Sequence, residues 1–126
     1  MSKIIGIDFG TKKVGIALTD ENQKLAFPVD VVKRGEVLKR ILLIAQKEKV
    51  KEVVLGESTQ LNMEDNPVME DIRKFAKELK NEGFKVYYHN EYMSSMQASR
   101  IQGYNKKQDA SAAAIVLQNY IDTKNA

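Results

Sequence analysis

The sequence has no cysteine, no tryptophan and only one histidine. The lack of cysteine excludes disulfides, thiolate catalysis and cysteine-ligated zinc or iron–sulfur centres. The single histidine, His89, excludes mechanisms and metal sites that need two imidazoles. No apolar run approaches the ~20 residues needed to cross a bilayer, and the first residues do not have the pattern of a secretion signal. We therefore expect a cytoplasmic protein without a membrane partner.

The chain is a balanced mixture of apolar and charged residues. Its 126 residues are 43% hydrophobic and 29% charged, which predicts one folded domain spanning residues 1–126. That length is too short for a two-lobed ATPase. The net charge of +3 permits nucleic-acid binding but does not by itself identify a partner.

Three short apolar runs near the start predict strands at residues 3–9, 14–19 and 25–32. Short polar turns separate these runs, which is typical of an antiparallel meander. Pro28 lies inside the third run and removes a hydrogen-bond donor, so we expect an edge position or a bulge there. Over residues 37–45 the apolar positions repeat at helical spacing, which predicts a helix.

The remainder of the chain alternates between strands and helices. Strands are predicted at residues 52–56 and 84–88, and helices at residues 67–83, at 94–101 and from residue 108 or 109 onward. The order β-β-β-α-β-α-β-α-α predicts an α/β fold, a mixed five-stranded sheet with helices on both faces. The first, fourth and fifth strands should be parallel neighbours in the buried middle, with ligand binding at their carboxyl ends.

Three carboxylates are positioned to meet at that edge: Asp8, Glu91 and Asp109. Asp8 is the only charge between Ile5 and Gly10 in the most apolar predicted strand, Glu91 follows the fifth strand, and Asp109 opens the last helix. Asp109 also continues the helix face that carries Ala113 and Leu117. Close carboxylates repel each other unless a cation or a shared proton lies between them.

Oxygen-only ligands of this kind suit Mg²⁺ or Mn²⁺. A pair of such ions activates a water and stabilises the leaving oxygen in phosphodiester cleavage. Each acid also has a simpler interpretation, since Asp109 could cap its helix and Glu91 could be a solvated loop charge. Asp8 is harder to explain in this way, because a charge in a buried strand is costly unless it is paired or metal-bound.

Basic residues lie beside two of the acids and could contact a phosphate backbone. Gly10 permits a tight turn after Asp8, and lysines follow it; Arg34 extends this basic rim. Solvated surface lysines are the simpler interpretation for any one of them. The candidate substrate-binding residues are Thr11, Lys12, Lys13, Arg100, Lys106 and Lys107.

Aromatic residues and the histidine offer weaker signals. His89 is close to Glu91, but a lone histidine at a strand end is more often structural than catalytic. Tyr87, Tyr88 and Tyr104 could stack nucleic-acid bases. Strand alternation places the two adjacent tyrosines on opposite faces, so we expect one of them in the core.

The motifs around the acids resemble those of the YqgF family, described as Holliday junction resolvases and as pre-16S ribosomal RNA nucleases. Residues 6–17 resemble its first motif, residues 91–95 its second acidic motif and residues 109–118 its C-terminal motif. The resemblance covers nearly the whole chain and implies a ribonuclease H-like fold. It carries the family's metal-binding catalytic set over to Asp8, Glu91 and Asp109.

The sequence departs from the family pattern at two places. Tyr92 stands where the family has an arginine directly after the second acid, and no proline follows shortly after Gly56. Both changes bear on phosphate contacts and substrate choice and leave the three acids in place. Glu57 could add an outer carboxylate.

The leading hypothesis is therefore a Mg²⁺- or Mn²⁺-dependent endonuclease that cleaves pre-ribosomal RNA or branched DNA. One alternative is a non-catalytic nucleic-acid-binding ribosome-assembly factor that keeps the fold. Another is a nucleotide-phosphate binder of the actin or sugar-kinase type, although the chain has no second glycine-rich phosphate loop. A junction resolvase needs paired cuts and favours a homodimer, whereas a single-cut RNA nuclease works as a monomer.

Overall fold

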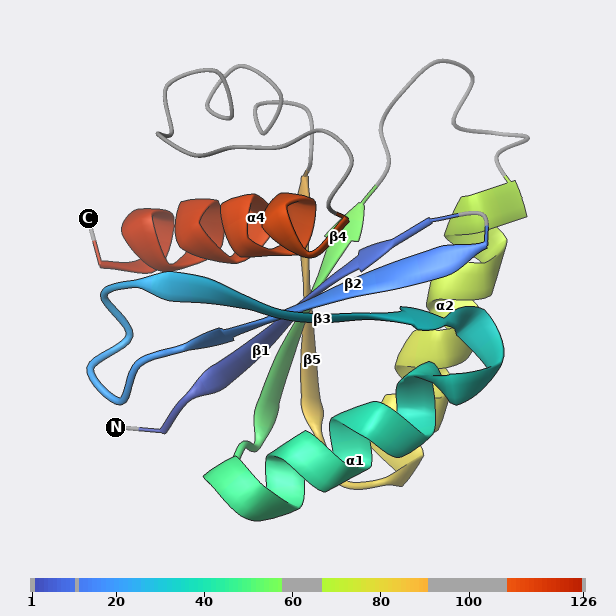
Figure 1. The fold of residues 1–126 in the computed structure, drawn as a ribbon, viewed down its shortest axis with the longest axis horizontal. Helices are drawn as coiled ribbons and strands as arrows, with labels where there is room; N and C mark the ends of the chain where they lie inside the picture. The colour runs from blue at the N-terminus through green and yellow to red at the C-terminus, as the bar shows by residue number, and fades with distance from the viewer. Residues whose placement is uncertain (1, 11, 58–66, 91–108, 126) are drawn as a thin grey trace.

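The computed structural model describes residues 2–10, 12–57, 67–90 and 109–125 (Figure 1). Five strands form one mixed sheet in the order β3-β2-β1-β4-β5. The first half of the chain forms β1 (Ile4–Phe9), β2 (Lys13–Thr19), β3 (Ala26–Lys33), a 3-10 turn (Arg34–Glu36) and α1 (Val37–Glu48). The second half forms β4 (Glu52–Glu57), α2 (Pro67–Asn81), β5 (Lys85–Asn90) and α4 (Asp109–Lys124). The predicted short helix at residues 94–101 lies outside the described residues.

Strand pairing follows the predicted order. The first three strands pair antiparallel as a meander, and β1, β4 and β5 are parallel neighbours. Pro28 lies on the edge strand β3, where the register shifts between Ile16 and Ala17 of β2. The proline therefore occupies both an edge and an irregularity, because its missing N–H cannot join a regular ladder.

Helices cover both faces of the sheet, with α1 and α2 on one side and α4 on the other (Figure 1). Ile5 and Ile7 of β1 lie in the core under α1 and α2, whereas Ile4 lies in the smaller core under α4. All three side chains are fully buried. Because side chains alternate along a strand, the face on which each later residue of β1 lies is fixed by these three.

β5 is an edge strand, so the expectation that it lies in the buried middle is wrong. Tyr87 and Tyr88 are 37% and 38% exposed, and the expectation that one of them belongs to the core is wrong as well. The physical reason is that β5, among the described residues, has a strand neighbour on one side only, so less of the molecule packs around its side chains.

None of the described helices is long and apolar enough to cross a membrane.

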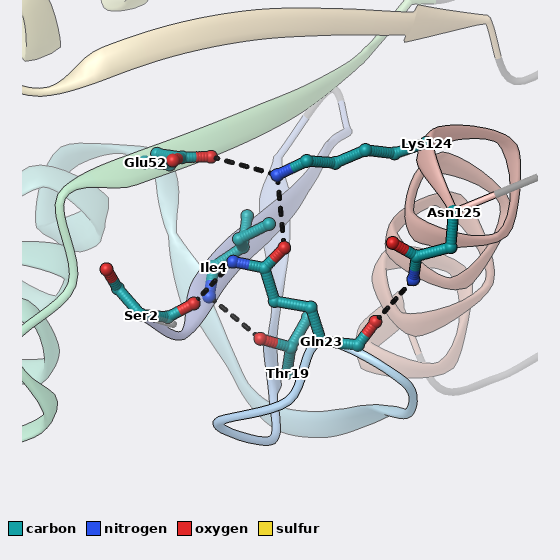
Figure 2. Close-up of polar contacts among 7 residues, drawn as sticks. All are labelled: Ser2, Ile4, Thr19, Gln23, Glu52, Lys124 and Asn125. Carbon is teal, nitrogen blue, oxygen red and sulfur yellow. Dashed lines mark hydrogen bonds and ion pairs between the residues drawn. The ribbon is translucent and has the colours of Figure 1, made fainter.

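A polar cluster fixes the carboxyl end of α4 against the start of the sheet (Figure 2). The Lys124 ammonium donates to Gln23 Oε1 at 3.1 Å and lies 3.9 Å from a carboxylate oxygen of Glu52, the first residue of β4. The Gln23 amide donates to the carbonyl of Ser2 at 2.6 Å, and Asn125 donates to the carbonyl of Gln23 at 3.0 Å. The end of α4 is thereby tied to the amino ends of the central strands.

Gln23→Ala should destabilise the protein by about 1–3 kcal/mol, because it removes two hydrogen bonds that each contribute about 0.5–1.5 kcal/mol. Gln23 is only 4% exposed, and its loss removes the acceptor of Lys124 and the donor to Ser2. Urea unfolding measures the change in free energy. Lys24→Ala, at the next and exposed position, is the matched control and should change stability by less than about 0.5 kcal/mol; equal losses in both variants would contradict the role given to Gln23.

Candidate active site at the carboxyl edge of the sheet

Asp8 lies near the carboxyl end of the central strand, on the face covered by α4. It shares this face with Ile4 and Gly6, and it is partly exposed, whereas Ile4 is fully buried. A Cβ placed on Gly6 would lie 2.6 Å from Cβ of Leu117, so α4 packs directly on the backbone of β1 there. Asp8 is the next residue on that face toward the sheet edge. Its carboxylate therefore stands where the helix-covered core opens to solvent, which lowers the cost of its charge.

Glycines flank Asp8 on both neighbouring strands. Asp8 pairs with Gly15 of β2. On the other side Ile7 pairs with Leu55, so one step further along the parallel strands Asp8 is level with Gly56 of β4. Neither glycine places a side chain beside the carboxylate. An oxygen ligand with this much free space suits Mg²⁺ or Mn²⁺, which keep part of their water shell when they bind proteins.

The same level of the sheet carries His89 on β5, because Gly56 pairs with His89. His89 faces α4, with its ring 6.0 Å from the ring of Tyr120 in an edge-on arrangement. Asp8 and His89 are separated by two strand spacings, about 10 Å. The imidazole therefore lies on the same face as Asp8 without being its direct neighbour.

Asp109 is the first residue of α4, as the sequence predicted. Ala113 and Leu117, one and two helical turns further on, are fully buried and confirm which face of the helix turns inward. At the end of α4 the Lys124 side chain reaches Glu52, the first residue of β4, and in the middle of α4 Leu117 packs on Gly6. The helix therefore runs from the carboxyl edge of the sheet toward its amino edge. The backbone of Asp109 lies about 12 Å beyond Leu117 in the direction of that carboxyl edge.

Several predicted site residues lie outside the part of the chain that the structure describes. They are Glu91, Thr11, Arg100, Lys106 and Lys107. Glu91 directly follows Asn90, which ends β5 and pairs with Glu57 at the end of β4. Within the described ranges no group of three or more acidic, histidine or cysteine side chains could hold a metal ion. The complete acid cluster thus stays a prediction, of which the placement of Asp8 and of the start of α4 is observed.

Arg34 has a different role from the basic rim that the sequence suggested. Its Nε donates to the carbonyl of Gly10 at 2.8 Å, and its Nη1 lies 2.6 Å from a carboxylate oxygen of Asp71 in α2. The guanidinium also lies 4.8 Å from the ring centroid of Phe9. Arg34 directly follows β3, and its side chain joins the β1–β2 turn to α2. Its partner in the turn, Gly10, is two residues from Asp8.

The turn itself requires glycine at position 10. The Gly10 N–H donates to the carbonyl of Lys13 at 2.9 Å, and a Cβ on Gly10 would lie 2.6 Å from that same oxygen. A side chain at this position would force the backbone apart. The tight turn and the hydrogen bond from Arg34 together fix the backbone that directly follows Asp8.

Two exposed lysines flank the acid on the side of β2 and β3. Lys13 begins β2 on the same face as Gly15, and it pairs with Lys33, the last residue of β3. Like charges directly opposite each other on a sheet are destabilising unless an anion lies between them. Sequence reasoning missed Lys33, because its position opposite Lys13 depends on the register shift in β3. Lys12 is also exposed, in the turn.

Solved structures share this arrangement and define the class of fold. The chain resembles Thermus thermophilus RuvC in complex with a Holliday junction substrate, with a TM-score of 0.65 and 17% identity over 100% of this chain and 97% of that chain. A second Thermus thermophilus RuvC structure gives a TM-score of 0.59 at 15% identity, over 98% and 96% of the two chains. The fold is therefore ribonuclease H-like, as the sequence resemblance implied.

The chain belongs to the RuvX family of Holliday junction resolvases, whose family profile matches residues 2–123. A candidate pre-16S rRNA nuclease from Bacteroides fragilis is 33% identical over 98% of this chain and 99% of its own length. A candidate pre-16S rRNA nuclease from Endomicrobium trichonymphae is 33% identical over 99% of both chains. RuvX and YqgF are two names of the same family, so the resemblance found in the sequence is confirmed. The family supports a nuclease of the resolvase type.

Proposed function

We propose that the protein is a divalent-metal-dependent endonuclease that cleaves structured nucleic acid, with Asp8, Glu91 and Asp109 as its catalytic and metal-binding residues. The observation that carries the proposal is the position of Asp8. It is a partly exposed carboxylate at the end of the central strand, with glycines on both sides and lysines beyond. The carboxylate of such a site attracts a cation, and the lysines around it attract a polyanion.

The acids would hold Mg²⁺ or Mn²⁺, which when bound supplies a nucleophile from water and stabilises charge on the phosphate. The chain's own residues do the positioning. β1 holds Asp8 on a rigid strand with helices on both of its faces. Lys13 and Lys33 attract the phosphate backbone to that strand end, and Arg34 fixes the turn between them and the acid.

We further propose precursor 16S ribosomal RNA as the substrate. The names of the full-length relatives support this choice, since the chain spans nearly their whole length. Branched DNA is the competing substrate, supported by the description of the family. We place the reaction in the cytoplasm, where precursor ribosomal RNA is matured.

The deciding experiment offers the purified protein two labelled substrates, a fragment carrying the 5′ end of 16S rRNA with its precursor extension and a synthetic four-way DNA junction. We expect Mg²⁺-dependent cleavage of the RNA at a defined site, and EDTA should abolish it. Cleavage of the junction alone would replace the RNA by DNA as substrate. Binding without cleavage of either substrate would contradict the nuclease and favour a non-catalytic assembly factor.

The paired lysines should account for part of the salt dependence of binding. Lys13→Gln and Lys33→Gln are each expected to reduce the slope of log affinity against log salt by about 0.7–0.9, one phosphate contact each. Each should also raise stability by a few tenths of a kcal/mol, because the like-charged pair is relieved. Filter binding across a salt series and urea unfolding measure the two effects. Lys39→Gln, exposed on α1 over the opposite face, is the control and should leave the slope unchanged.

A further inference from the structure

The edge strand β5 presents a row of three unlike side chains on the face of Asp8. Tyr87 contacts α4 through Tyr120, and alternation places Lys85 and His89 on the same face. Lys85 is exposed and Tyr87 is 37% exposed. A cation, an aromatic ring and an imidazole therefore follow each other along the open edge of the sheet, and the last of them is level with Asp8.

Tyr120 orders the rings of this row. Its ring centroid lies 5.8 Å from that of Tyr87, at an interplanar angle of 34°, and 6.0 Å from that of His89. Burial, followed by the neighbouring Tyr87 and Glu52, raises the pKa of Tyr120, so its hydroxyl stays neutral at physiological pH. Tyr87 is thus packed against a neutral ring, and 37% of its surface remains exposed to solvent.

The spacing fits a strand of nucleic acid that reaches the proposed active site. Neighbouring side chains on one face are about 6.6 Å apart along a strand, close to the length of one extended nucleotide. Tyr87 lies one such step back and two strands across from Asp8, about 12 Å away by standard sheet dimensions. That distance corresponds to about two nucleotides.

We propose that Tyr87 is a base-stacking subsite, which takes an unpaired base about two nucleotides from the bond that is cleaved. This inference rests on the proposed function and adds to it that the substrate is single-stranded beside the cut. Stacking on an aromatic ring is tolerant of sequence, because every base has a π-face. Tyr88 has the same exposure and lies on the opposite face, away from Asp8, so it takes no part.

The test compares two neighbouring tyrosines of equal exposure. Fluorescence anisotropy measures the binding of a labelled 12-nucleotide RNA, of the DNA strand of the same sequence and of the corresponding RNA duplex, all in EDTA so that no cleavage occurs. Tyr87→Leu should weaken single-strand binding about tenfold, within the range for a lost base stack, and duplex binding less than twofold. Tyr88→Leu should change neither, and Tyr87→Phe, which keeps the ring, should bind as the wild type does.

Equal effects of Tyr87→Leu and Tyr88→Leu, no effect of either, or no single-strand binding by the wild type would overturn the subsite. If Tyr87→Leu weakens the binding of single-stranded RNA but not of single-stranded DNA, the stacked base comes from RNA, and the reverse result assigns it to DNA. Thermal unfolding of each variant verifies that the fold is retained. Since binding is measured without metal, a Tyr87 effect in a protein that fails to cleave would refute the proposed nuclease and leave Tyr87 as a base-stacking residue with no cut beside it.

Discussion

Asp8→Asn is expected to reduce the rate of Mg²⁺-dependent cleavage about a thousandfold, because electrostatic stabilisation by a bound metal is worth several kcal/mol and ~1.4 kcal/mol is a factor of ten. The amide has the shape of the carboxylate but lacks its charge. Single-turnover cleavage of the labelled substrate measures the rate. Calorimetric titration with Mn²⁺ should show a matching loss of metal affinity.

The control for Asp8→Asn is Glu82→Gln, which makes the same change in net charge. Glu82 is exposed in the turn between α2 and β5, at the amino ends of the parallel strands, whereas Asp8 lies near their carboxyl ends. Its replacement should leave both cleavage and Mn²⁺ binding unchanged. In the absence of metal, Asp8→Asn should be at least as stable as the wild type, since it would remove one charge from the proposed acid cluster. Undiminished cleavage by Asp8→Asn would refute the assignment of the site.

Gly6→Ala should destabilise the protein by about 1–3 kcal/mol, the usual cost of overpacking a core. The new methyl group would lie 2.6 Å from Cβ of Leu117, an atom that α4 holds rigidly, so helix and strand must separate. Because Asp109 begins that same helix, the displacement should also weaken Mn²⁺ binding if Asp109 is a ligand. Urea unfolding and Mn²⁺ titration measure the two effects.

The matched control for Gly6→Ala is Gly35→Ala. A Cβ on Gly35 would meet no atom within 4 Å, so this variant should be neutral or slightly more stable. The two variants add the same methyl group and differ in what it meets. A loss of stability in both would show that glycine flexibility, and not the contact with α4, explains the first result.

Local patterns in the sequence were sufficient for most of the fold. Alternation and helical spacing predicted each described strand and α-helix within a few residues, and Pro28 indicated an edge strand or a bulge, of which the structure shows both. The position of β5 was mispredicted, although no further strand was predicted after it to supply a second neighbour. The expectation that either Tyr87 or Tyr88 belongs to the core rested on strand alternation alone, and both are exposed on this edge strand.

The candidate site was predicted where charge and position coincide in one segment, and missed where distant segments meet. Asp8 was recognisable as a charge in an apolar strand, and the start of α4 at Asp109 was anticipated. The bond from Arg34 to Gly10 joins residues 24 positions apart, and no local pattern encodes it. The pairing of Lys13 with Lys33 depends on the register of two strands across a bulge, which periodicity does not determine.

The irregular edge at Pro28 also affects how the protein behaves at high concentration. Phe27 and Val29 are exposed on this outermost strand and Leu25 just before it, a pattern that would otherwise template the addition of a strand from another copy. The proline offers no N–H to such an intruder, and the shifted register prevents a continuous ladder. We therefore expect the edge farthest from β5 to resist strand addition from another copy.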